Sequence, residues 1–299
     1  MSYPPVPKRK SWLLFVLAPA VIASPLLTVE VAQYNPKAAI ATAQPSNQAT
    51  SKLPPKPFPV PGWLGFASVP ASAKHKFPWS PSHPSGQIVI FSDAWSQVKP
   101  GTPLVALAPG VKQPVRFLRS SEERYGCDGV PTSMAAFSAP KKLSEGPVWV
   151  MRQQDTGTAT ALPMQDLPLA NVPANLLPRP LPKKSDARAW KAGNVTIVLR
   201  KQSAYKAKLT LAINSRVVYS NIEEKYFFGG AEREPVNLSK DYPDPGIARP
   251  IGAFQLKAEA APTIVLWQPG YEGHSFNIIV TEGKTSKLVE AGQVYFCAY

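Results

Sequence analysis

Short runs of apolar residues, separated by glycine and proline turns, recur along the chain from residue 87 onward. The run 195–199 is apolar apart from Thr196, which is typical of a buried strand, whereas leucine and isoleucine alternate with smaller residues over 209–213, as in a half-buried strand. The pair Asn214-Ser215 then precedes the apolar residues 217–219 and predicts a hairpin. Further strands are predicted at 87–91, 104–107, 115–118, 148–151, 263–267, 276–280 and 294–299.

These strands predict a mainly β fold, a sandwich or a barrel-like arrangement, divided into two β lobes. The first lobe covers residues 85–162 and the second covers residues 187–299. Between them, residues 163–186 contain six prolines, which predict a linker or a long crossing loop. Proline accounts for 35 of the 299 residues, and because proline breaks helix interiors, this content argues against a helical protein.

The N-terminal region, residues 1–43, has the layout of a secretory signal peptide: a basic cluster at 8–10 is followed by an apolar run at 12–23. The alternative is an uncleaved membrane anchor helix, because residues 12–29 carry no formal charge and reach the lower length limit for a span. The basic cluster stays on the cytoplasmic side in both cases. The rest of the chain is therefore expected outside the cytoplasm, as a periplasmic, cell-surface or secreted protein that contacts the membrane through this segment if it is uncleaved.

Residues 44–84 hold ten prolines and predict a Pro-rich tether behind the export or anchor segment. Alternating prolines favour an extended, semi-rigid polyproline II chain. A ligand for a proline-binding partner domain is the alternative to a plain spacer.

Two cysteines, Cys127 and Cys297, fall one in each predicted lobe. In an exported chain such a pair is expected to form a disulfide, which would join the two lobes and hold the last predicted strand. The alternative is two separate buried thiols, each acting as a small apolar side chain.

The formal net charge of +14 is concentrated in part in residues 183–208, where Trp190 and Tyr205 lie among eight basic side chains and only one acidic residue intervenes. This composition suits a surface that binds an anionic lipid or an acidic glycan. The alternative is a solvated strand face whose lysine stems cover apolar surface. The predicted binding residues are Lys183, Lys184, Arg188, Trp190, Lys191, Arg200, Lys201, Lys206 and Lys208.

No motif for a cofactor, a metal or a catalytic nucleophile is found, and no catalytic residue is assigned. Histidine occurs only at positions 75, 83 and 274, and His274 is interpreted as a turn residue. The acidic groups considered for a carboxylate pair are interpreted as solvated turn residues; they are Asp128, Glu223, Glu224 and Glu272.

The preferred function is therefore a non-enzymatic binding or structural module of the cell envelope or extracellular space, in contact with anionic lipid or glycan. The alternative is an exported, carboxylate-dependent hydrolase acting on envelope polymers. Nucleic acid fits the charge, but the export segment argues against it.

Overall fold

The computed structural model describes residues 60–67, 87–92, 98–99, 101–125, 130–226, 234–241, 243–258, 260–270 and 273–295, and only the backbone of 121–125, 130–132 and 295. All of them belong to one unit of the chain, Lys52–Tyr299. The predicted signal or anchor region and both cysteines lie outside these ranges, so the export segment and the disulfide stay predictions. In the part of the chain that is described, no helix combines the length and the apolar character needed to cross a bilayer.

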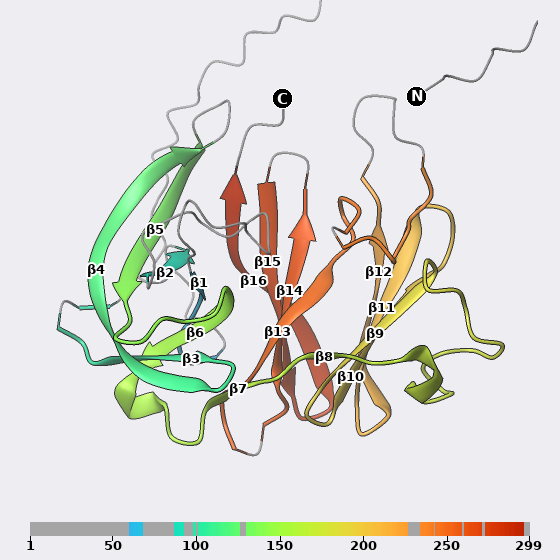
Figure 1. The fold of residues 1–299 in the computed structure, drawn as a ribbon, viewed down its shortest axis with the longest axis horizontal. Helices are drawn as coiled ribbons and strands as arrows, with labels where there is room; N and C mark the ends of the chain where they lie inside the picture. Colours follow the sequence, from blue (N-terminus) through green and yellow to red (C-terminus); the bar gives the residue numbers. More distant parts are fainter. Residues whose placement is uncertain are drawn as a thin grey trace, which may run out of the picture. The chain divides into compact units, whose positions relative to one another are not determined.

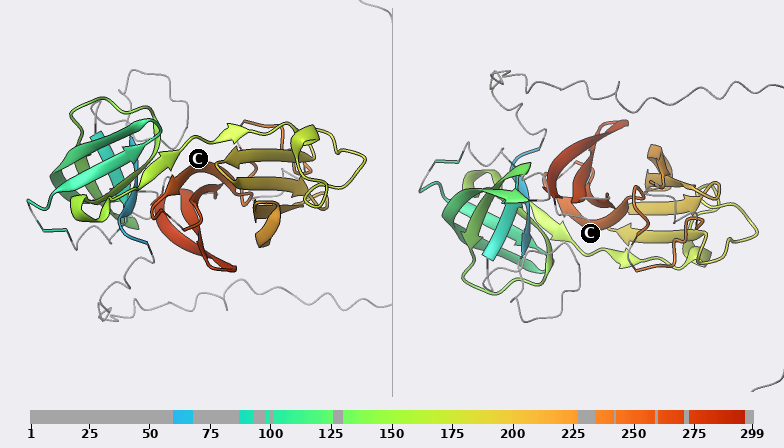
Figure 2. Two further views of the ribbon diagram at one scale, coloured as in Figure 1. Left: turned by 90° about the horizontal axis from the view of Figure 1, so that it is seen from below. Right: turned by 90° about the horizontal axis from the view of Figure 1, so that it is seen from above.

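The protein is mainly β, as predicted, and every strand pairing among the described residues is antiparallel. Six strands close a barrel in the order β1-β2-β5-β4-β3-β6 (Figures 1 and 2). Their bounds are β1 Trp63–Ala67, β2 Gln87–Phe91, β3 Leu104–Ala108, β4 Val111–Tyr125, β5 Val130–Ser138 and β6 Gly146–Arg152.

Two five-stranded sheets follow the barrel along the chain. The first, called here the middle sheet, has the order β16-β15-β14-β13-β7, with β7 Thr160–Leu162, β13 Arg249–Gln255, β14 Thr263–Pro269, β15 Gly273–Glu282 and β16 Thr285–Tyr295. The second, called here the basic sheet, has the order β12-β11-β10-β9-β8, with β8 Gln165–Asp166, β9 Ala187–Ala192, β10 Val195–Lys201, β11 Lys206–Ile213 and β12 Arg216–Glu224. Short 3₁₀ turns lie at Gln153–Asp155 and Leu169–Asn171.

The inner strands of the middle sheet, β13 to β15, are largely buried on both faces. One face shares a core with the barrel, in which the rings of Phe66 and Phe276 lie 4.3 Å apart and those of Trp149 and Phe254 lie 5.5 Å apart. The other face packs against the basic sheet through Ile264, Leu266 and Ile279 among other buried residues. A strand without a solvent face needs apolar residues at successive positions, which explains the continuous apolar run 264–267 in β14.

The predicted hairpin at Asn214-Ser215 is confirmed. It joins β11 to β12, and both residues have positive φ angles, 49° and 66°. These values match a two-residue type I′ turn, whose twist fits that of the strands on either side.

The prediction missed six strands, β1, β5, β7, β8, β9 and β13, and placed the start of β16 too late. β1 lies inside the range predicted as tether, although its five residues are all buried and pair with β2 and β6. Prolines on both sides concealed this short apolar segment, which is a barrel strand and not part of a spacer. β16 begins at Thr285, well before the predicted start at 294, because as an edge strand it exposes polar residues that interrupt the apolar pattern.

Residues 163–186, predicted as a linker or crossing loop, pass from the middle sheet to the basic sheet. β7 pairs with β13 in the former and β8 pairs with β9 in the latter. After β8 the segment lies against the basic sheet, where Val172, Leu176 and Leu177 are buried with Ala189 and Val198.

Candidate functional site

The side chains of the predicted basic stretch lie on both faces of the basic sheet. Side chains alternate along a strand, and the register pairs Arg200 with Lys208 and Thr196 with Lys191. These residues share the outer face, defined here as the side of the sheet that bears Val198 and Thr210 and is turned away from the middle sheet. Lys191, Arg200, Lys206 and Lys208 occupy the outer face, whereas Arg188, Trp190 and Lys201 occupy the opposite one.

Trp190 does not form part of an exposed binding surface. Its side chain is only 6% exposed and packs with Ile197 and Leu209 in the core shared with the middle sheet. The Arg188 guanidinium lies 5.3 Å from the centre of the Trp190 ring and 3.4 Å from a carboxylate oxygen of Asp166. The interpretation of Trp190 as a surface aromatic is therefore corrected, because even a basic strand must supply large apolar side chains to the core.

The outer face contains a pocket of about 350 Å³. One wall is the segment 174–178, and the Asn175 side-chain amide holds this wall by donating to the Ser215 carbonyl at 2.8 Å. The sheet supplies the remaining lining residues, which are Val198, Arg200, Lys208, Thr210, Val217 and Ser220. Guanidinium, ammonium and hydroxyl groups thus meet apolar side chains in one hollow.

The pocket has an unbalanced positive charge. Arg200 and Lys208 are directly opposite each other on neighbouring strands, an arrangement that destabilises a sheet by charge repulsion. Other lysines of the basic stretch have acidic partners: Lys201 lies 3.8 Å from Asp186, and Lys206 lies 3.3 Å from Glu224. Among the described residues, Arg200 and Lys208 have no acidic partner within ion-pair distance. An anion placed between them would relieve the repulsion.

Lys183 and Lys184 are exposed and precede β9, in a turn closed by the hydrogen bond from the Asp186 N–H to the Lys183 carbonyl. Strand β10 ends beside this turn, because the N–H of its last residue, Lys201, donates to the Asp186 carbonyl. These two lysines therefore extend the positive charge beyond the end of β10 that carries Arg200.

The two described carboxylates considered for hydrolysis, Glu223 and Glu224, lie on opposite faces of β12. Glu223 is buried and accepts hydrogen bonds from Asn221 at 3.0 Å and Gln268 at 3.4 Å, and its burial raises the pKa of its carboxyl group. Glu224 points to the opposite face of β12, where it pairs with Lys206. These two carboxylates therefore do not face one cleft, while Asp128 and Glu272 lie outside the described residues.

His274 lies at the start of β15 and not in a turn, which corrects the prediction. Its ring meets Trp267 edge-on at 5.5 Å, and it is buried, so desolvation lowers its pKa to about 4. A neutral imidazole here contributes to the core.

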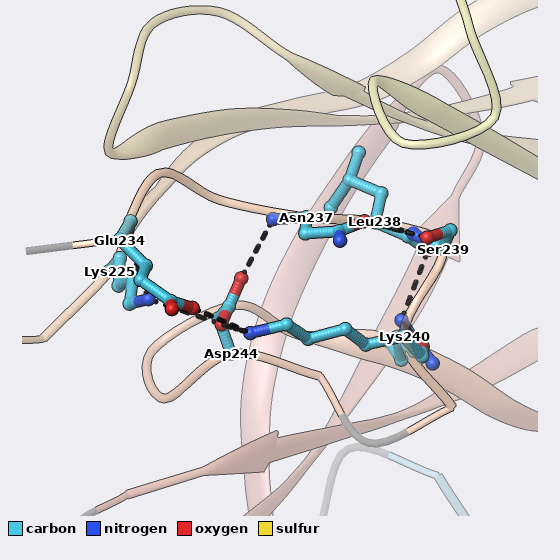
Figure 3. A network of polar contacts seen from close by, with 8 residues as sticks. Lys225, Glu234, Asn237, Leu238, Ser239, Lys240 and Asp244 are labelled. Atoms are coloured by element: carbon cyan, nitrogen blue, oxygen red, sulfur yellow. Dashed lines mark hydrogen bonds and ion pairs between the residues drawn. The ribbon is translucent and has the colours of Figure 1, made fainter. Parts of the chain in front are cut away.

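A buried ion pair fixes the segment that follows β12 (Figure 3). The Lys225 ammonium donates to Asp244 Oδ1 at 3.2 Å and to the Glu234 carbonyl at 3.0 Å. The second carboxylate oxygen of Asp244 accepts the Asn237 N–H at 2.9 Å, and Lys240 donates to Oδ1 at 3.3 Å from the solvent side. The buried ammonium of Lys225 and both carboxylate oxygens of Asp244 therefore have partners, which is what a buried ion pair needs in order to hold a segment in place.

Sequence reasoning located the basic stretch but missed Thr210, Ser220 and the wall at 174–178. Hydroxyl residues and a proline-flanked loop carry no binding signal until the strand register brings them beside Arg200 and Lys208. In comparisons with known proteins, no protein-family model, no curated protein and no solved structure matches the chain.

Proposed function

We propose that the protein is a binding or structural module that acts outside the cytoplasm and contacts anionic lipid or acidic glycan through the outer face of the basic sheet. The observation that carries this proposal is the direct opposition of Arg200 and Lys208 in a hollow that also presents hydroxyl groups. Guanidinium and ammonium groups bind phosphate, sulfate and carboxylate oxygens through charge-assisted hydrogen bonds. The hydrolase alternative gains no support from Glu223 and Glu224, which lie on opposite faces of β12.

The binding proposal is tested by removing charge from the outer face and its extension. A variant with Lys183, Lys184, Lys191 and Lys208 changed to Ser should bind heparin and anionic vesicles at least 100-fold more weakly, because each basic residue near an anionic surface contributes about 1 kcal/mol. Binding of the unchanged protein should also weaken as salt is raised, since exposed charges are screened over about 8 Å at physiological ionic strength. Both affinities are measured by co-sedimentation or surface plasmon resonance.

The matched control removes the same charge elsewhere. Lys99, Lys142, Lys257 and Lys284 are exposed residues outside the basic sheet, and changing all four to Ser should leave most of the affinity intact. Equal losses in the two variants would show that net charge alone attracts the ligand, and would refute a binding face.

The same proposal places the protein outside the cytoplasm. Residues 1–43 act as a signal peptide or anchor, the Pro-rich residues that follow them and precede β1 act as a tether to the two β lobes, and Cys127 and Cys297 form a disulfide. Fusing residues 1–60 to a reporter that is active only outside the cytoplasm should give an active fusion. A fusion that accumulates without reporter activity would contradict export, and with it the oxidising environment that the disulfide needs.

A further inference from the structure

We infer that the anionic partner is the surface of a phospholipid membrane, which the basic sheet meets along its β12 edge. This inference rests on the proposed function and adds one observation, the exposed apolar side chains beside the cationic pocket. Val217 lines the pocket and is 45% exposed, and Ile222 lies directly opposite Lys208 and is 54% exposed. Neither position is required by the core.

Exposed large apolar side chains are concentrated at this edge. The described residues contain six of them, of which three lie within ten positions of one another on β12 and the residues that follow it: Val217, Ile222 and Tyr226. The other three are on separate segments, at Leu118, Leu181 and Leu288. Single exposed apolar residues are ordinary, but a cluster on an edge strand exposes the protein to aggregation unless it has a use.

Charge and apolar surface are arranged as an interfacial protein requires. Basic residues next to exposed aliphatic side chains can bind headgroup phosphates while the aliphatic groups enter the boundary with the acyl chains. Lys208 and Ile222 are cross-strand neighbours on one face, so cationic and apolar groups lie about 5 Å apart at their Cβ atoms. An acidic glycan would use the cations but would gain little from Val217 and Ile222.

The pocket is suited to the phosphate group itself. Arg200 can donate two parallel hydrogen bonds to phosphate oxygens, and Lys208 adds a point charge from the opposite strand. Thr210 and Ser220 line the same hollow and supply hydroxyl donors. Val217 completes the lining toward β12, which pairs only with β11 among the described strands and so forms the edge of the sheet. A lipid whose headgroup is held between Arg200 and Lys208 can therefore extend its apolar portion toward Val217 of β12.

The test separates the apolar contribution from the charge. In the full chain, Val217→Thr with Ile222→Thr keeps β-branched side chains and all charges. Affinity for vesicles that contain phosphatidic acid or phosphatidylglycerol should fall at least tenfold, while heparin affinity stays within twofold of the unchanged protein. Leu118→Thr with Leu288→Thr is the matched control and should change neither affinity. Residues 1–43 are present in every variant, so any contribution from them cancels in the comparison.

Charge removal gives the complementary result. Arg200→Ser with Lys208→Ser should weaken binding both to anionic vesicles and to heparin, and thermal unfolding of each variant confirms that the fold is kept. Undiminished vesicle binding by the Val217→Thr, Ile222→Thr variant would overturn the membrane inference. If ultracentrifugation of that variant then showed a changed oligomeric state, the two apolar residues would belong to a contact between copies of the chain. Heparin binding that still depends on Arg200 and Lys208 would then leave the proposed function standing. Failure of the unchanged protein to bind either probe would remove both.

Discussion

Replacing Asp244 with Asn should lower the free energy of unfolding by about 3–5 kcal/mol, as expected when one member of a buried ion pair is removed. The side chains of Lys225 and Asp244 are only 2% and 5% exposed. Without the carboxylate charge, the Lys225 ammonium would stay buried with neutral acceptors alone in the described network, the Glu234 carbonyl and the amide oxygen of the new asparagine. The loss is measured by urea unfolding followed by tryptophan fluorescence.

The exposed pair of Lys206 and Glu224 is the control, since its side chains are about half exposed and the two atoms lie at a similar distance, 3.3 Å. Changing Glu224 to Gln should cost at most about 1 kcal/mol, because a solvated ion pair contributes little. A cost for Asp244→Asn no larger than that of Glu224→Gln would contradict the structural role of the buried network.

The effect of Asp244 should also depend on pH. Burial by itself would raise the pKa of this carboxyl group, but the Asn237 N–H and the two lysines outweigh burial and hold the pKa below its ordinary value of 3.8. The carboxylate therefore stabilises the fold fully above that value, and its contribution is lost as the pH falls from 3.8 through the lower pKa of the folded state. The stability difference between the unchanged protein and Asp244→Asn should shrink over that range.

Changing Phe276 to Ala should destabilise the whole described unit by about 3–5 kcal/mol, the usual cost of deleting a buried phenyl group. Phe276 lies on the middle sheet and is fully buried against Phe66 of the barrel, at a ring distance of 4.3 Å. Because these rings belong to one core, the barrel and the middle sheet should lose stability together. Calorimetry should show a single transition at a lower temperature.

A double-mutant cycle with Phe66→Ala should give a coupling energy of about 0.5–1.5 kcal/mol for the ring pair. Leu288→Ala, at an exposed position on β16, is the control and should stay within about 0.5 kcal/mol of the unchanged protein. Two separate transitions, of which Phe276→Ala shifts only one, would show that the barrel and the middle sheet unfold independently.

The sequence predicted best those elements whose structure depends on neighbouring residues. The β11–β12 hairpin was predicted from the residue pair Asn214-Ser215, which tolerates positive φ angles, and the strand at 263–267 from its short apolar run between turn residues. β1 was missed because five residues between prolines have no local feature that separates a barrel strand from a spacer. Its partners β2 and β6 are distant in the sequence, so only tertiary pairing identifies it.

The candidate site was predicted in composition but not in arrangement. The basic stretch contained Arg200, Lys208 and Trp190, and the pattern of charge did not show that the first two share a face while the third is buried. Strand register decides this, since a shift of one residue moves every side chain to the other face of the sheet. Val217 and Ile222 could not be separated from core residues by hydrophobicity alone.

The middle sheet is completed by strands that lie on either side of the basic sheet in the chain, because Leu162 of β7 pairs with Ala253 of β13 while β8 to β12 come between them. Hairpins with short loops form early in folding, and pairings between distant segments form late. β7 therefore reaches its partner only after the inserted strands have been made. Until the barrel and the basic sheet pack against them, β13, β14 and β15 present apolar surface on both sides, so the folding chain is prone to aggregation during this interval.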